Sequence, residues 1–220
     1  SKFAFKLFIA TEQWIGKKTK GIMCDTITNI KALDSFMQTE VYSSLDKTTK
    51  TAIESKKTEQ CGNYFLHIAA NLHRNKYKGC YAPHKAVMII AIIDLIESGH
   101  FTTNAILLDK ELKNRFKEVW HQTVPKGSPF KCDYRNPFTY MNSEPFWNLS
   151  ANKDMAYITW ESYHAFSHKD SNSAIKSFLI RSIIDDTISR EYSNNFPNIN
   201  MMVAENLISI IPLLGFLVAV

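Results

Sequence analysis

A group of cations stands directly before an apolar helix in the middle of this chain. Five side chains there can contact an anion: Arg74, Lys76, Lys78, His84 and Lys85. No acidic residue occurs between Glu59 and Asp94. If Pro83 is the first helical residue, Ala82 is the N-cap and offers no side-chain acceptor to the free N–H groups of the first turn. Those groups and the positive end of the helix dipole favour a phosphate. The alternative is a buried helix start flanked by solvated lysines.

A second segment, from Lys126 to Tyr140, interleaves cations with aromatic rings. Its candidate contact residues are Lys131, Tyr134, Arg135, Asn136 and Tyr140. Cations on an irregular loop can follow a phosphate backbone while rings pack against sugars or bases. Phe138, Phe146 and Trp147 are expected instead to anchor a hairpin in the core. Both segments therefore indicate a surface for nucleic acid, and since both must meet the same duplex we expect them on one face.

Residues suited to hydrolytic chemistry are present, but their spacing is unfavourable. His164 and His168 can share a helical face, yet the sequence between them holds no glutamate and no third ligand lies nearby. Asp94, Glu111 and Lys113 match an acid followed by E-x-K, but that chemistry needs a strand and both pieces have helical patterns. We therefore expect no catalytic residue, no metal and no cofactor. The alternative is a metal-dependent nuclease whose acids and histidines meet only in the fold.

Charge and composition are compatible with these expectations. The 220 residues contain 26 Lys and Arg against 21 Asp and Glu, a formal net charge of +5 and a pI near 8.9. This excess fits an anionic partner but is too mild to demonstrate one. A hydrophobic share of 45% with seven Gly and seven Pro is ordinary globular usage and excludes collagen, coiled-coil and disordered classes.

The cysteines and the C-terminal segment bear on localisation. Four cysteines lie far apart without the spacing of a zinc ribbon, which favours reduced thiols in the cytoplasm: Cys24, Cys61, Cys80 and Cys132. The apolar run from Leu207 to Val220 is interrupted by Pro212 and Gly215 and is shorter than the ~20 residues that span a bilayer. We expect a cytoplasmic protein with no membrane partner.

A stretch rich in Ser, Thr and Lys, from Tyr42 to Glu59, is expected to be a polar helix or linker that separates an N-terminal region from the rest of the chain. We expect a helical N-terminal extension of unknown role over residues 1–59, a recognition domain over 60–192 and an apolar tail over 193–220. Within the domain, the run from Ala86 to Ile96, opened by Pro83 and followed by Gly99, predicts a buried central helix. Residues 125–150 lose the helical period and predict a β-hairpin or wing. The expected fold is mainly α with this small β element, an α+β fold.

Two stretches together carry a resemblance to a known family. They read NYFLHIAANLHRNKYKGCYAPHKAVMIIAIIDLIESG, from Asn63 to Gly99, and NPFTYMNSEPFWNL, from Asn136 to Leu149. The pattern of P-H-K before a long aliphatic helix, then P-F-x-x-M and F-W-x-L, resembles the DNA-recognition domain upstream of the HNH nuclease in bacterial restriction endonucleases. It is also similar to the sulfur-binding domain of type IV restriction enzymes, which recognises phosphorothioate DNA. The resemblance covers roughly Asn63 to Tyr192.

Carried over residue by residue, the resemblance implies particular roles. The family's His-basic pair falls on His84 and Lys85, as DNA contacts. Its Pro-Phe pair falls on Pro137 and Phe138, which would form the apolar pocket that receives sulfur. Asn136 stands where the family usually has an aromatic residue. An apolar surface tolerates sulfur, a poor hydrogen-bond acceptor, better than it tolerates a phosphate oxygen.

The resemblance implies a DNA-binding module of a restriction or defence system. It would bind double-stranded DNA, including phosphorothioate or otherwise modified DNA, and work with an HNH nuclease domain or subunit whose segment this sequence does not contain. Besides the nuclease alternative, a protein-interaction domain remains open, in which the apolar tail docks a partner.

Overall fold

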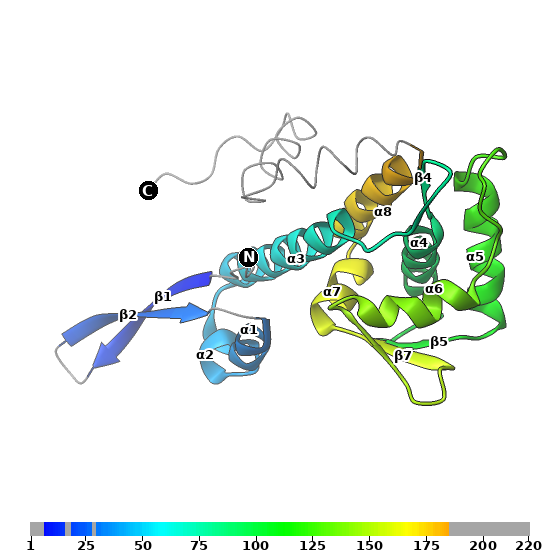
Figure 1. Ribbon diagram of the computed structural model, residues 1–220. Helices are drawn as coiled ribbons and strands as arrows, with labels where there is room; N and C mark the ends of the chain where they lie inside the picture. Colours follow the sequence, from blue (N-terminus) through cyan, green and yellow to red (C-terminus); the bar gives the residue numbers. More distant parts are fainter. Residues whose placement is uncertain (1–6, 16–18, 28–29, 185–220) are drawn as a thin grey trace.

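The computed structural model of the chain describes residues 7–15, 19–27 and 30–184 (Figure 1). The helices are α1 (Ile30–Met37), α2 (Glu40–Ser44), α3 (Lys47–Ala70), α4 (His84–Glu97), α5 (Lys110–Thr123), α6 (Arg135–Tyr140), α7 (Trp160–Ser167) and α8 (Lys169–Ile184), with a 3-10 turn η2 (Met141–Ser143). The strands are β1 (Leu7–Ile15), β2 (Thr19–Ile27), β3 (Lys76–Tyr77), β4 (Cys80–Tyr81), β5 (Ala105–Leu107), β6 (Trp147–Leu149) and β7 (Met155–Ile158). Strand β1 pairs with β2 and β3 with β4, and the third sheet has the order β5-β7-β6, all antiparallel. The predicted mainly α, α+β fold is confirmed.

Helix α4 forms the centre of the core. Ten of its fourteen residues are buried, from Ala86 to Ile96 with the exception of Asp94, because the helix is apolar on all sides and is covered by α5, α6, α7 and α8. It begins at His84, one residue later than predicted. Pro83 is the N-cap, and no side chain caps this helix end. The first basic segment, residues 74–85, therefore leads directly into this buried helix.

Helix α3 joins the N-terminal elements to this core. Its N-cap Asp46 accepts a hydrogen bond from the Thr49 N–H, and the helix then runs through position 59 without a break. Its second half packs closely on α7 and α8, where Gly62 is required because a Cβ there would lie 2.9 Å from Ser171 Cβ. The predicted domain boundary between residues 59 and 60 therefore falls inside one helix.

The predicted helical extension over residues 1–59 is wrong in its first half. Residues 7–27 contain the two nine-residue strands β1 and β2, which pair from Leu7 with Ile27 to Ile15 with Thr19. Strand pairing in an isolated ribbon has little sequence signature beyond its β-branched and aromatic residues. The helices α1 and α2 follow, and Lys57 of α3 forms an ion pair with Asp34 of α1 at 2.5 Å.

The predicted hairpin over residues 125–150 is also wrong in part. Its PFTYM stretch is helical, in α6 and η2, and only β6 is a strand, paired with the later β7. Asp133 accepts a hydrogen bond from the Arg135 N–H at 2.9 Å, and Pro137 sits in the first turn, where a missing N–H costs no helical bond. An aspartate just before the N-cap, which accepts the first N–H of the helix, and a first-turn proline thus start a helix too short to show periodicity.

The predicted apolar tail over residues 193–220 lies outside the described residues. Within the described part of the chain, no helix is both long and apolar enough to cross a lipid bilayer.

Candidate nucleic-acid interface

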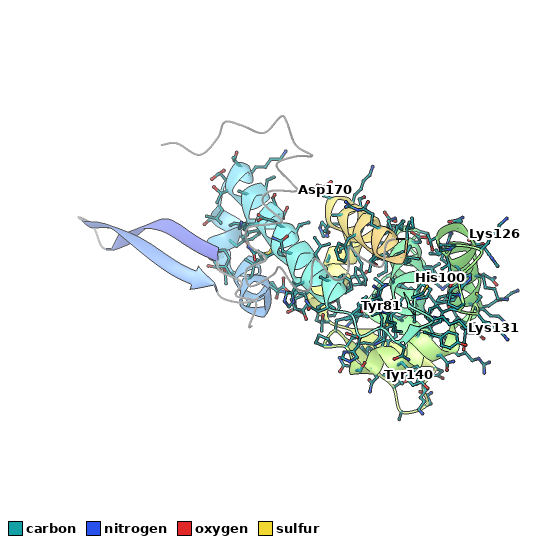
Figure 2. All side chains as sticks on the ribbon, turned by 45° about the horizontal axis from the view of Figure 1, so that its top comes forward. Tyr81, His100, Lys126, Lys131, Tyr140 and Asp170 are labelled. Carbon is teal, nitrogen blue, oxygen red and sulfur yellow. The ribbon has the colours of Figure 1, made fainter. Side chains whose placement is uncertain are left out.

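The two basic segments found in the sequence contact each other in the structure. The Tyr77 ring on the β3–β4 hairpin meets the edge of the Phe130 ring in the loop after α5, with centroids 6.3 Å apart. His84 at the start of α4 contacts the Lys131 carbonyl oxygen through Nε2 at 2.8 Å. In Figure 2, Tyr81, Lys131 and Tyr140 lie in the same part of the molecule. Segments about fifty residues apart in the chain therefore form one surface.

The β3–β4 hairpin presents cations on a stiff support. Its two turn residues, Lys78 and Gly79, have φ of 49° and 82°, the left-handed pair that a two-residue hairpin turn requires. Lys76, Tyr77 and Lys78 are all exposed. The Lys78 ammonium lies 5.5 Å from the centre of the Tyr77 ring, and that of Lys76 lies 5.3 Å from the Tyr81 ring. Cation–π contacts hold these charges near the surface while leaving their hydrogen-bond donors exposed.

A second cluster of cations surrounds Tyr134. The Arg135 Nε donates to the Tyr134 hydroxyl at 3.1 Å, and Lys113 lies over the same ring at 5.5 Å. The hydrogen bond from Arg135 and the charges of Arg135, Lys113 and Lys117 lower the pKa of Tyr134. Lys113 and Lys117 come from α5, four residues apart on one helix face. These two lysines are not among the contact residues expected from the sequence, since only the fold brings α5 beside Tyr134.

The basic surface is defined here as the exposed or half-exposed cations and tyrosines joined by these contacts: Lys76, Tyr77, Lys78, Lys113, Lys117, Lys131, Tyr134 and Arg135. The acid within it, Asp133, accepts hydrogen bonds from the backbone N–H of Arg135 and from the Asn136 side chain. Asn136 is thus exposed, but its side-chain amide is hydrogen-bonded to Asp133. Tyr140, at the other end of α6, is 65% exposed.

Lys85 is not part of this surface, which corrects its assignment as a DNA contact. Its ammonium forms an ion pair with Glu144 at 2.5 Å, and the two side chains are only 11% and 6% exposed. Glu144 also accepts a hydrogen bond from the His73 N–H at 3.2 Å. The lysine therefore neutralises a buried carboxylate that fixes the chain just before the β3–β4 hairpin.

His84 and Arg74 also hold the structure together, so neither is the free phosphate donor that the sequence suggested. His84 packs on Trp120 with centroids 4.8 Å apart, and burial lowers its pKa. Because the Lys131 carbonyl oxygen can only accept, the His84 Nε2–H is the donor of their hydrogen bond. Arg74 donates to the Ser182 carbonyl at 3.2 Å, near the C-terminal end of the described part of α8. Both residues position the basic surface.

The pocket expected at Pro137 and Phe138 is not open in the structure. Both residues are buried, and Phe138, with no exposed surface, packs edge-on against Trp147 at 5.0 Å. The Pro-Phe pair lies in the first turns of α6 with its apolar groups turned into the core. A sulfur atom on DNA cannot reach these side chains, so this part of the sequence prediction is wrong.

The described residues contain no group of three His, Cys, Asp or Glu side chains that could hold a metal ion. His164 and His168 do stack, at 4.0 Å between ring centroids, but His164 Nε2 contacts Thr58 Oγ1 at 3.3 Å. Asp94 forms an ion pair with Lys176 of α8 at 3.2 Å. His164 and Asp94 thus take part in contacts between helices, and His168, the C-cap of α7, contacts His164 of that helix.

No protein-family model and no curated protein sequence matches this chain. What the chain does must therefore be inferred from the charges and contacts of the basic surface.

Proposed function

We propose that this chain is a DNA-binding module that holds double-stranded DNA on the basic surface. The observation that carries the proposal is that the β3–β4 hairpin and the start of α4 both contact the loop after α5, through Tyr77 with Phe130 and through His84 with Lys131. These contacts bring the cations of residues 76–78 close to those of 131–135, and the Lys113 ammonium over the Tyr134 ring joins residues 113–117 to the same loop. A duplex carries one negative charge per ~1.7 Å of its axis, so a surface of this kind can contact several phosphates at once.

The arrangement of the side chains supports a nucleic acid over a simple anion. Phosphate contacts position a protein on a duplex, and aromatic groups beside them pack on sugars and bases. On the basic surface each tyrosine lies under a cation, as with Lys78 over Tyr77 and Lys113 over Tyr134. Such pairs match the alternation of charged and flat groups along DNA.

The wider role follows from the motif resemblance described above. We propose that the module belongs to a bacterial restriction or defence system and delivers a separate HNH nuclease domain or subunit to DNA, including modified DNA. If a phosphorothioate duplex binds more tightly than its unmodified counterpart, the sulfur contacts residues other than Pro137 and Phe138, because those two are buried.

Fluorescence anisotropy with a labelled duplex at several salt concentrations tests the DNA binding. Lys131→Ala and Arg135→Ala each remove one exposed cation, and each lowers the slope of log K against log salt by roughly 0.9 if it loses one phosphate contact. Lys169→Ala is the matched control. This lysine is also exposed, but it is the first residue of α8 and is not part of the basic surface. Its neighbour Asp170 is labelled in Figure 2. Equal slopes in wild type and both interface variants would contradict the proposal.

A further inference from the structure

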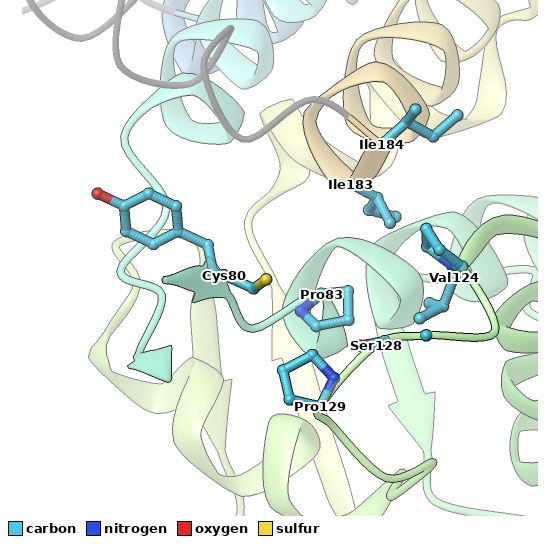
Figure 3. Close-up of a pocket in the computed structure, with 10 residues that line it drawn as sticks. Cys80, Pro83, Val124, Ser128, Pro129, Ile183 and Ile184 are labelled. Carbon is cyan, nitrogen blue, oxygen red and sulfur yellow. The ribbon is translucent and has the colours of Figure 1, made fainter. Parts of the chain in front are cut away.

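A small pocket opens between β4, the start of α4, the loop after α5 and the end of the described part of α8 (Figure 3). It has a volume of about 170 Å³, and its walls include Cys80, Pro83, Val124, Ser128, Pro129 and Ile183. A single water needs only ~10–15 Å³ of such space, whereas sites for drug-sized ligands have ~300–1,000 Å³. The pocket therefore has room for one small ring system and not for a large cofactor.

The walls are suited to the faces of a flat ring. Figure 3 shows Pro83, Pro129, Val124 and Ile183 grouped around the same space, with the Cys80 sulfur pointing toward Pro83. Proline rings and branched aliphatic chains pack on an aromatic face without requiring hydrogen bonds. Ser128 adds a polar group, because its Oγ accepts from the Phe130 N–H at 3.4 Å and its hydroxyl proton can be donated to a ligand.

Two lysines are close in the sequence to residues that line the pocket. Exposed Lys126 stands between Pro125 and Gly127, which both line it. Exposed Lys78 stands two residues before Cys80, at the tip of the β3–β4 hairpin. An occupant that complements both features carries an apolar flat group and negative charges on either side of it. An apolar protein side chain lacks those charges, and a free phosphate lacks the flat group.

We propose that this pocket receives one nucleobase turned out of the DNA duplex, with Lys78 and Lys126 contacting the phosphates next to it. The inference rests on the DNA binding proposed above and adds what part of the DNA is read. Enzymes and readers that examine single bases use apolar pockets in this way, and the cost of unstacking is smallest for a mismatched or modified base. The protein should therefore favour such positions over ordinary base pairs.

The experiment uses the full chain and a duplex with one 2-aminopurine, a base whose fluorescence rises when it leaves the stack. The fluorophore is placed either in a normal pair or in a mismatch, and anisotropy of a second label confirms saturation. We expect a several-fold rise on binding, larger in the mismatched duplex. A flat signal at saturating protein in both duplexes would overturn the inference while leaving DNA binding intact.

Gly127 offers a way to fill the pocket without changing charge. A Cβ built there meets no other atom within 4 Å, so Gly127→Leu fits locally and adds bulk at the pocket wall, and Gly127→Ala is the small control. Leucine should abolish the 2-aminopurine rise at an unchanged salt slope, and alanine should preserve the rise. Ser128→Phe fills the pocket from a second position and should act as leucine does.

If the 2-aminopurine fluorescence still rises fully with both Gly127→Leu and Ser128→Phe, the inference is also overturned, because the base then leaves the stack without entering this pocket. No salt-dependent binding by the wild-type chain to any duplex would instead reject the proposed function itself, and the base pocket with it.

Discussion

Breaking the ion pair between Lys85 and Glu144 should destabilise the fold and leave the salt dependence of DNA binding unchanged. The two side chains are 11% and 6% exposed, so removing either partner strands a charge away from water. Losing one partner of a buried pair costs about 3–5 kcal/mol. Lys85→Met keeps the length and apolar stem of the lysine. Glu144→Gln keeps an oxygen for the His73 N–H, which donates at 3.2 Å, and removes only the charge.

Each single variant should therefore lose about 3 kcal/mol of unfolding free energy, which lowers the melting temperature by roughly 10 °C for a domain of this size. The double variant Lys85→Met with Glu144→Gln should lose clearly less than the sum of the two, since neither charge is then left unpaired. Urea or guanidinium unfolding followed by circular dichroism gives both the free energies and the coupling.

DNA binding by folded Lys85→Met shows whether Lys85 is paired with Glu144, as in the structure, or contacts DNA, as the sequence suggested. A buried lysine contacts no phosphate, so the slope of log K against log salt should equal that of wild type. A slope lower by roughly 0.9 with wild-type stability would refute the reasoning, because Lys85 would then contact DNA and not the carboxylate.

Three further predictions concern other parts of the fold. Burial and the charges of His168 and Lys57 lower the pKa of His164 to about 3, so the folded state binds fewer protons than the unfolded state. The contribution of His164 to the free energy of unfolding is therefore fully present above the unfolded pKa near 6.5. As the pH falls from 6.5 toward 3, the free energy of unfolding should decrease by up to ~1.4 kcal/mol per pH unit. His164→Gln should reduce this decrease, measured by unfolding at several pH values. Gly62→Ala should cost about 1–3 kcal/mol, because its Cβ would lie 2.9 Å from Ser171 Cβ, and an unchanged melting temperature would contradict that contact. Exposed Cys132 should react with a thiol reagent in the folded protein and be protected by bound DNA, whereas Cys61, whose pKa burial raises to about 12, should react only on unfolding. Equal rates for these two cysteines in the native state would count against the burial of Cys61.

The long apolar pattern of α4 was sufficient to predict a buried central helix, because an uninterrupted aliphatic run with Pro before it and Gly after it has few alternatives. Short elements were not predictable in the same way. Helix α6 has six residues, so the hydrogen bond from the Arg135 N–H to the Asp133 side chain decides its structure more than any hydrophobic period does. Strands β1 and β2 depend on pairing with each other, which local propensity does not report.

For the site, sequence reasoning identified the two basic segments but not which cations are exposed. Lys76, Lys78, Lys131 and Arg135 remain at the surface, whereas Lys85 is paired with a glutamate 59 positions later. Whether a lysine contacts solvent or a buried acid depends on tertiary contacts that spacing along the chain does not contain. Lys113 and Lys117 were missed for the same reason, since only the fold brings α5 beside Tyr134.

The most direct test of the account is the salt dependence of duplex binding for wild type and for one combined variant. The variant replaces Lys76, Lys78, Lys131 and Arg135 by alanine. All four are exposed, and none forms an ion pair with another residue that the structure describes. The account predicts salt-dependent binding by wild type and a slope smaller by roughly 3 to 4 in the variant, with little change in melting temperature. Identical slopes for the two proteins, or wild-type binding that does not weaken with salt, would contradict it.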